Sequence, residues 1–194
     1  MTPLTPRPEV MDFLLTRRSR PAKTLTAPAP DRTALAPILE AALRVPDHGK
    51  LEPWRLVVLT GAAPERLAGI VARRGAERGL EAEKLAKAQA MFRDAPCLVA
   101  VIAAPVPSEK VPEGEQVLSA GAVCLGLVNA ALASGWGANW LTGWMATDDA
   151  VLHDGLGAGP GEFVAGWIVI GTEGSVPPDR PRPDMDAKVA WVDA

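Results

Sequence analysis

Two short segments concentrate the residues of this chain that could bind a charged ligand. The first spans residues 17–20, with the sequence Arg-Arg-Ser-Arg, and closes a brief amphipathic stretch. The second spans residues 44–55 and places Arg44, His48 and Lys50 between an expected helix and an expected strand. Arginine side chains match the geometry of phosphate, and helix ends supply further N–H donors. A phosphorylated small molecule is therefore the first ligand to consider, while a solvent-facing surface run is the alternative for residues 17–20.

The overall charge indicates that this basic concentration serves a local need. The chain has 194 residues and a formal net charge of −3. A mildly acidic protein offers no electrostatic case for binding nucleic acid or an anionic membrane surface. At this length we expect a single domain over residues 1–194, large enough to bury a substantial core.

The cysteines and the N-terminal segment indicate a cytoplasmic protein. Cys97 and Cys124 are the only cysteines, and both stand in apolar runs without metal-binding or redox spacing. Such thiols behave as small apolar groups and are typical of a reducing compartment. The N-terminus carries Pro3, Pro6 and Pro8 where a signal peptide would have an apolar core.

An uncharged stretch over residues 116–147 has to be weighed as a membrane span. It is rich in Ala, Gly and Ser, and both Asn129 and the turn signal at residues 135–137 interrupt it. A span needs about 20 strongly apolar residues. We therefore predict no membrane contact, and instead a helix that is buried inside the fold or between subunits.

Hydrophobic periodicity predicts strands that alternate with helices. An extended arm over residues 1–9 precedes two helices, the first over residues 10–17 and the second capped by Asp31 and running to about Arg44. Strands are expected at residues 55–60, 97–103, 138–142 and 163–171. Further helices are expected from Pro64, over residues 81–92 outside the core, over residues 113–134 and over residues 148–155. This order indicates a sheet covered by helices on both faces.

Common catalytic motifs find no support in this chain. Residues 155–161 are rich in glycine, but a strand follows them and Pro160 breaks the pattern, so we reject a dinucleotide-binding loop. Hydrolase, zinc-protease and NTPase signatures are absent from the sequence, and two histidines do not support a metal site. His153 is expected at the surface. If the protein is an enzyme, we expect a cofactor to carry the chemistry, with no side chain as catalytic base or nucleophile.

The two basic segments and their order resemble the flavin-dependent nitroreductase family. Arg-Arg-Ser at residues 17–19 is followed by Arg44-x-Pro-Asp-His-x-Lys-x-x-Pro-Trp-Arg55. The resemblance continues through residues 119–121, residues 133–137 with Trp140, and the end of the last strand at residues 171–172. It covers the chain from about Val10 to Trp191 and looks closest to the small, single-domain members of the family.

The resemblance implies an α+β fold, a three-layer α-β-α sandwich around a central mixed sheet, in a homodimer. Residues 172–194 would be an exchanged C-terminal tail that adds a strand to the partner's sheet. FMN would lie between the two subunits. The implied chemistry is hydride transfer from NADH or NADPH to FMN N5, then electron transfer to a nitroaromatic, quinone or similar small acceptor in the same pocket.

The resemblance also implies which residues bind the cofactor. Arg17, Arg18 and Ser19 match the stretch that contacts the FMN phosphate and ribityl chain. A dianionic phosphate would gain charge-assisted hydrogen bonds from the two guanidinium groups. Arg44 and His48 match further flavin contacts, and part of their segment would reach the flavin of the partner subunit.

Two later stretches also match cofactor-binding parts of the family. The stretch that lies against the isoalloxazine ring matches Trp140, Leu141 and Thr142. The stretch associated with the nicotinamide cofactor matches Ala130, Ala131, Leu132, Ala133, Ser134 and Gly135. Leu141 and Glu52 depart from residues common in close relatives, which could alter the acceptor pocket. Arg180 and Arg182 could also reach the phosphate, or they could belong to a solvated tail.

Two other interpretations of the sequence stay open. A flavin-binding carrier or sensor would have the same FMN contacts but would not oxidise NAD(P)H steadily with an added acceptor. A structural protein with merely surface-exposed arginines would purify without colour.

Overall fold

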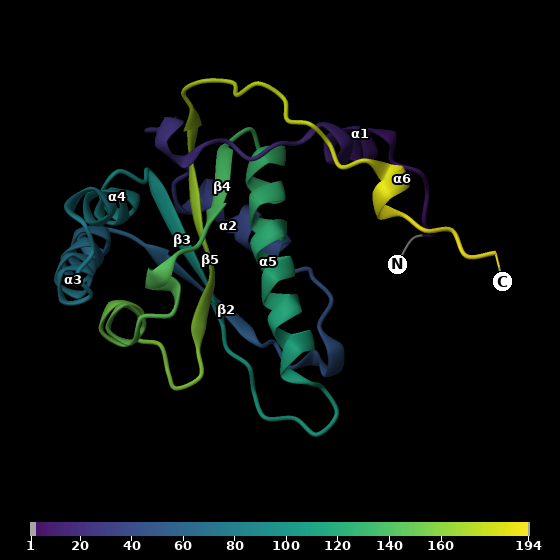
Figure 1. Cartoon of the computed structure of the whole chain (residues 1–194). Helices are drawn as coiled ribbons and strands as arrows, with labels where there is room; N and C mark the ends of the chain where they lie inside the picture. The colour runs from purple at the N-terminus through teal and green to yellow at the C-terminus, as the bar shows by residue number, and fades with distance from the viewer. Residues whose placement is uncertain (1–2, 194) are drawn as a thin grey trace.

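Five strands form the centre of the protein, as the computed structural model of residues 3–193 shows (Figure 1). Apolar runs become strands where the expected pattern places them, with ends shifted by one or two residues. The strands are β1 (Leu25–Thr26), β2 (Trp54–Leu59), β3 (Cys97–Ala103), β4 (Gly137–Leu141) and β5 (Phe163–Glu173). Four of them confirm the predicted strands, whereas the two-residue β1 was not predicted.

Strand β5 lies at the centre of the sheet. Both β3 and β4 pair with its residues 167–170, so they must occupy opposite edges of it, and β1 pairs with its last two residues. Strand β2 pairs with β3 and forms one outer edge of the sheet. All pairings among the described residues are antiparallel, so the expected mixed sheet is wrong in this respect.

A helical hairpin explains why β2 and β3 are antiparallel. Helices α3 (Ala63–Glu77) and α4 (Ala82–Arg93) pack on each other between the two strands. The first helix leads the chain away and the second leads it back, so β3 starts beside the end of β2, with Leu98 opposite Leu59. A single crossover helix would have brought the chain to the other end and made the strands parallel.

Side chains alternate between the two faces of the sheet, which gives the molecule two cores. In β3, Leu98, Ala100 and Ile102 point to one face and Val99 and Val101 to the other, and all five are essentially fully buried. Helices α3 and α4 cover the first face, while α2 (Arg32–Ala42) and α5 (Glu113–Ala133) cover the second (Figure 1). The predicted α+β class and its three layers are thereby confirmed.

Three of the helices differ from the sequence expectation in where they begin, end or pack. Helix α1 (Pro8–Thr16) begins inside the expected arm, because proline is well suited to the first turn of a helix. Asp31 caps α2 as predicted, by accepting from the N–H of Ala34 at 2.8 Å, but the helix ends at Ala42. Helix α4 is not outside the core, because its Phe92 is fully buried edge-to-face against Trp167, with 5.0 Å between ring centroids.

Helix α5 is long and apolar enough to span a membrane by length and composition alone. It packs against α2 and against strands β3, β4 and β5. A helix that covers a sheet in this way is also long and apolar, so it passes the same length and composition test as a membrane span. The other face of α5 is exposed, with Leu118 at 76 % and Leu125 at 47 % accessibility. The predicted helix is therefore confirmed over residues 113–133, and it is buried by this subunit on one side only.

The chain after β5 leaves the body (Figure 1), and its Arg180 and Arg182 line the same cavity as Arg17 and Arg18, which follow α1. It includes the short helix α6 (Met185–Lys188), and its apolar residues Val176, Met185, Trp191 and Val192 are strongly exposed. Residues 172 and 173 of the expected tail belong instead to β5 and pair with β1 of the same chain. Strand exchange by the remaining tail stays a prediction.

Asp148 is a buried carboxylate that fixes the turn before β5. It accepts from the backbone N–H groups of Ala150 (3.2 Å) and Val151 (3.3 Å) and pairs with Arg74 Nε at 3.1 Å. This places the short π-helical turn η4 (Val151–Gly155), found where a regular helix over residues 148–155 was predicted, against α3. Burial by itself would raise the pKa of Asp148, but these hydrogen bonds hold the pKa below its ordinary value.

Asp148→Ala is expected to lower the free energy of unfolding by about 2 kcal/mol near neutral pH, because hydrogen bonds to charged groups contribute about 1.5–3 kcal/mol each. The pKa of Asp148 is lower in the folded chain, so its stabilisation is present above the unfolded pKa and is lost as pH falls through the folded value. Chemical denaturation of both proteins should therefore show a stability gap that closes on acidification. A gap independent of pH would contradict this role.

Candidate functional site

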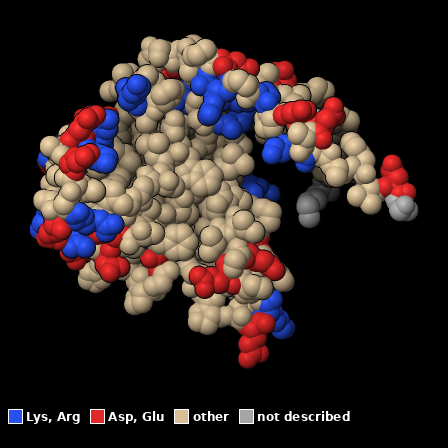
Figure 2. All heavy atoms as spheres, in the orientation of Figure 1, with Lys and Arg blue, Asp and Glu red and all other residues tan. Residues whose placement is uncertain are grey.

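The first basic segment lines a cavity of about 440 Å³ at one end of the sheet. Arg17, Arg18 and Ser19 are joined there by Asn139 and Trp140 of β4, and by two residues of the tail, Arg180 and Arg182. Figure 2 shows basic side chains gathered in the upper part of the molecule, where the tail leaves the body. The lining described in the structure contains no Asp, Glu, His or Cys, so this is a cationic cavity without an evident proton acceptor.

Two arginine atoms in this cavity are buried without a partner. Within residues 3–193, Arg17 Nε and Arg18 Nη1 make no hydrogen bond, although Arg17 Nη2 donates to Ser19 Oγ at 3.2 Å. The pKa of Arg17 is lowered by burial and by the nearby charges of Arg182 and Arg20. Buried donors of this kind are costly unless an acceptor reaches them. The cavity is therefore suited to a compact anion such as a phosphate.

Arg20 has a different role from the other two arginines of its segment. Its backbone N–H donates to Ala138 O at 2.8 Å, and its carbonyl accepts from Asn139 Nδ2 at 2.6 Å. Its side chain donates to Arg18 O at 3.0 Å and pairs with Glu173 at the end of β5. Arg20 thus ties the loop to β4 and β5, a role that the repeated arginines in the sequence did not reveal.

Trp140 forms an aromatic wall of the cavity. Its indole N–H donates to Ala165 O at 3.1 Å, and its ring reaches across β5 towards Gly121 of α5. A Cβ at Gly166 would collide with this indole and lie 2.8 Å from Cys124 Sγ, so a glycine is required for the ring to sit there. Trp140 is 38 % exposed, so part of this residue is accessible to a ligand in the cavity.

The other residues predicted beside Trp140 are placed differently. Leu141 points to the opposite face of the sheet, where it packs against the core under α3 and α4. Alternation along β4 enforces this, because successive side chains of a strand point to opposite faces. Thr142 follows β4 and is exposed. Only the backbone of Leu141 could therefore share a ligand with the Trp140 ring.

The second basic segment lies near the start of α5. His48 Nδ1 is 2.8 Å from Glu115 Oε2, and both side chains are exposed. Ser119 donates to Pro46 O at 2.6 Å and accepts from Trp54 Nε1 at 3.0 Å, so it fastens both ends of the turn to α5. Arg44 is exposed. Sequence reasoning did not identify Glu115 or the role of Ser119.

Backbone strain marks the turn between Pro46 and Trp54. Lys50 has φ +54° and Glu52 φ +49°, next to Gly49 at φ +73°. A left-handed conformation costs roughly 1–2 kcal/mol for each residue that carries a Cβ. Asp47 offsets this, because its carboxylate accepts the N–H groups of Leu51 at 3.1 Å and Glu52 at 2.9 Å.

The two basic segments do not meet within one chain. The segment at residues 44–55 contacts Glu115 and Ser119 in the first part of α5, whereas residues 17–20 contact the start of β4, which follows the end of α5. A helix of this length extends about 30 Å. The two segments are thus anchored toward opposite ends of α5 in the same chain.

Residues 130–135 form the C-terminal stop of α5. The N–H of Gly135 bonds to Leu132 O and that of Trp136 to Ala131 O, both at 3.0 Å, and Gly135 has φ +82°. This is a Schellman motif, which explains the glycine without any ligand. Ala131 is buried, Ala130 and Leu132 are half-buried, and Ala133, Ser134 and Gly135 are exposed at the helix end.

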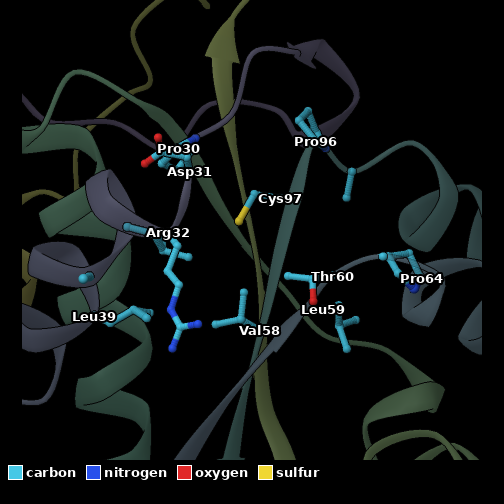
Figure 3. A pocket seen from close by; sticks show the side chains of 14 residues that line it. Pro30, Asp31, Arg32, Leu39, Val58, Leu59, Thr60, Pro64, Pro96 and Cys97 are labelled. Carbon is cyan, nitrogen blue, oxygen red and sulfur yellow. The ribbon is translucent and has the colours of Figure 1, made fainter.

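A larger cavity, of about 820 Å³, lies along the β2 edge of the sheet (Figure 3). Figure 3 shows it between the starts of α2 and α3, with Val58, Leu59 and Cys97 along the strands and Arg32 extending across it. Burial raises the pKa of the Cys97 thiol to about 11, so the thiol stays protonated at neutral pH. None of the sequence-predicted site residues lines this cavity.

A family profile and similar curated proteins agree on the family to which this chain is related. The profile of the nitroreductase family matches residues 14–172. A Haemophilus influenzae protein provisionally named NAD(P)H nitroreductase is 37 % identical over 166 residues, which covers 84 % of this chain and 88 % of that protein. An Escherichia coli K12 protein with the same provisional name is 33 % identical over 165 residues, with the same coverage.

Solved structures agree on the fold. A nitroreductase-like family protein from Bacillus cereus superposes with a TM-score of 0.78 at 22 % identity and covers all of both chains. The FMN and NADPH-dependent nitroreductase NfnB from a Sphingopyxis strain gives a TM-score of 0.68 at 21 % identity, covering 94 % of this chain and 98 % of that one. With a family profile matched over most of its length, this chain belongs to the nitroreductase family of oxidoreductases.

Proposed function

We propose that this protein is an FMN-dependent NAD(P)H oxidoreductase that delivers electrons to a nitroaromatic, a quinone or a similar small acceptor. The observation that carries the proposal is the pair of buried, unpartnered donors on Arg17 and Arg18 inside a cationic cavity. The phosphate of FMN is an acceptor of the right charge and size for them. The names of the relatives, NAD(P)H nitroreductases, support the same chemistry.

The residues present fit FMN in both of its parts. Arg17, Arg18 and Ser19 would hold the phosphate and the ribityl chain, with Arg180 and Arg182 closing the cavity from the tail. The exposed face of Trp140 would lie beside the flavin ring system. When bound, FMN supplies the redox chemistry, taking hydride from NAD(P)H and passing electrons to the acceptor.

The side chains of this site would act by binding and orientation. The arginines neutralise the phosphate, and the Trp140 ring keeps water from one side of the cofactor pocket. Donor and acceptor would use the same open face in turn, and no side chain of the described lining would serve as a base. The exposed residues Ser134 and Gly135 at the end of α5 remain the proposed nicotinamide contact.

We propose further that the enzyme is a homodimer in which each cofactor site takes residues from both subunits. The separation of the two basic segments supports this, since His48 of a second copy could reach a flavin bound at Arg17 and Arg18. The exposed outer face of α5, with Leu118 and Leu125, gives the subunits an apolar surface to bury.

The β2 edge gives the exchanged tail a place to bind. Within residues 3–193 no strand pairs with the outer edge of β2, beside the apolar cavity of Figure 3, and an open apolar edge favours strand addition. The tail ends in Val189, Trp191 and Val192, which are exposed on their own subunit.

Both cysteines are free thiols, in keeping with the proposed cytoplasmic setting.

The purified protein tests the proposal directly. Flavin absorbance that is released by denaturation and identified as FMN, together with steady NADPH or NADH oxidation on adding a nitroaromatic or quinone, is the expected result. FMN without acceptor-dependent turnover would indicate a carrier or sensor. A colourless protein that does not bind added FMN would remove the proposal altogether.

Arg18→Ala is expected to weaken FMN binding by roughly tenfold or more, because a hydrogen bond to a charged group contributes about 1.5–3 kcal/mol. Titration of FMN into the apo-protein, followed by flavin fluorescence, measures the change. Arg73→Ala is the matched control, since Arg73 lies exposed on α3 away from this cavity. Equal affinities for all three proteins would return residues 17–20 to a solvated surface run.

His48→Ala is expected to lower FMN affinity more than it lowers turnover of the FMN-saturated enzyme. The His48 imidazole, whose Nδ1 lies against Glu115, still has Nε2 to offer to a polar edge of the flavin, and hydride transfer needs no base there. His153→Ala controls for loss of an exposed histidine. Full FMN occupancy with activity reduced by orders of magnitude would make His48 a catalytic acid or a substrate anchor instead.

Leu118→Glu is expected to convert the dimer to monomer and to release FMN, because it would bury a charge in the proposed α5 interface, where Leu118 is strongly exposed on the single subunit. Light scattering gives the mass and absorbance gives the flavin content. Ala86→Glu, at an exposed position of α4, should stay dimeric and yellow. A stable wild-type monomer that retains flavin would contradict the shared site.

A further inference from the structure

The turn that carries His48 is held in shape by a carboxylate, and we propose that Asp47 is a positioning residue for the cofactor site. The inference rests on the proposed function, in which His48 and its neighbours reach the flavin of the partner subunit. In this view Asp47 does not touch the cofactor. It fixes the backbone from which His48 and Lys50 project.

The conformation of this turn is not one that its residues adopt unaided. Gly49, Lys50 and Glu52 all have φ between +49° and +73°, and only the glycine does so without a steric penalty. Burial does not enforce the conformation either, because residues 48–50 and 52 are exposed. Something other than core packing must therefore stabilise it.

The Asp47 carboxylate supplies that stabilisation. One of its oxygens accepts the N–H of Leu51 at 3.1 Å and the other the N–H of Glu52 at 2.9 Å. The Asp47 carbonyl also accepts from the N–H of Lys50 at 3.3 Å. Three consecutive N–H groups thus point back to one residue, and two of the bonds are charge-assisted.

The surrounding contacts fix the ends of the turn and the Glu52 carbonyl, which accepts the N–H of Trp54 at 2.7 Å, but the N–H groups of residues 50–52 are held by Asp47. Ser119 holds Pro46 and the Trp54 indole, at the two ends. Within the turn, His48 pairs with Glu115 through a side chain, which constrains the imidazole but not the backbone of residues 50–52. Loss of Asp47 should consequently alter the exposed turn while the helix and strand on either side remain in place.

Asp47→Ala tests this in the full-length protein. FMN affinity, measured by fluorescence titration of the apo-protein, is expected to fall about tenfold, or about 1.4 kcal/mol. Thermal unfolding of the same samples should change little. Hydrogen exchange at the amides of Leu51 and Glu52 should speed up in the apo-protein, which reports the turn without any flavin.

Two further variants separate positioning from general stability. Asp148→Ala is the matched control, since that carboxylate also accepts two backbone N–H groups but lies on the opposite face of the sheet. It should lower the melting temperature and leave FMN affinity unchanged. Glu52→Gly in the Asp47→Ala background should restore most of the FMN affinity, because glycine adopts the left-handed conformation without the carboxylate.

The outcomes are distinct. If wild-type protein binds FMN and Asp47→Ala binds it equally well, the positioning role is wrong while the proposed function stands. An affinity loss that Glu52→Gly does not reduce, or one that Asp148→Ala reproduces, also overturns the positioning role. Failure of the wild-type protein to bind FMN removes the proposed function, and the cofactor role of Asp47 with it.

Discussion

Strand β5 is paired along both edges and buried on both faces, and the position of the candidate site depends on it. Because β4 is hydrogen-bonded to β5, the Trp140 ring crosses Gly166, where a Cβ would leave no room. Arg20 continues this chain of contacts, since its backbone bonds to Ala138 of β4 and its side chain pairs with Glu173 of β5. The cationic cavity is therefore an extension of the sheet, although its key residues come from a loop.

This arrangement places several arginine side chains close together, although their positive charges repel one another. Arg17 and Arg18 stand beside Arg180 and Arg182, and the lowered pKa of Arg17 reflects burial and neighbouring cations. A bound anion would offset both costs, so ligand binding should stabilise the folded chain by mass action. It would also hold the tail against the body, because two of the four arginines belong to the tail. In the proposed enzyme, cofactor binding and placement of the tail would therefore be thermodynamically linked.

The structural features that could be predicted from the sequence are those that depend on a single segment of the chain. Residues 97–103 form a continuous apolar run because the strand is buried on both faces, and the Asp31 cap follows from local chemistry. The antiparallel direction of β2 and β3 could not be predicted, since it depends on α3 and α4 packing as a hairpin. Three arginines in four residues also look alike in sequence, yet Arg20 is structural while Arg17 and Arg18 line the cavity. The role of Asp47 could not be predicted either, because it depends on the left-handed backbone that brings the N–H groups of Leu51 and Glu52 to its carboxylate.

The two halves of the candidate site are fixed by separate sets of contacts, and both sets depend on the position of helix α5. Residues 17–20 are fixed through β4, which continues from the C-terminal end of α5. Residues 46–54 are fixed to the first turns of α5 by Ser119 and Glu115. In the proposed dimer the distance between the arginines of one subunit and His48 of the other would thus be set by how the two α5 helices pack. Small residues along α5 let elements of the same subunit approach it closely: the backbone of Ala42 lies against Gly126, and the Trp140 ring approaches Gly121. The geometry of a redox site could then be adjusted by packing substitutions on a helix that contributes few of the groups binding the cofactor.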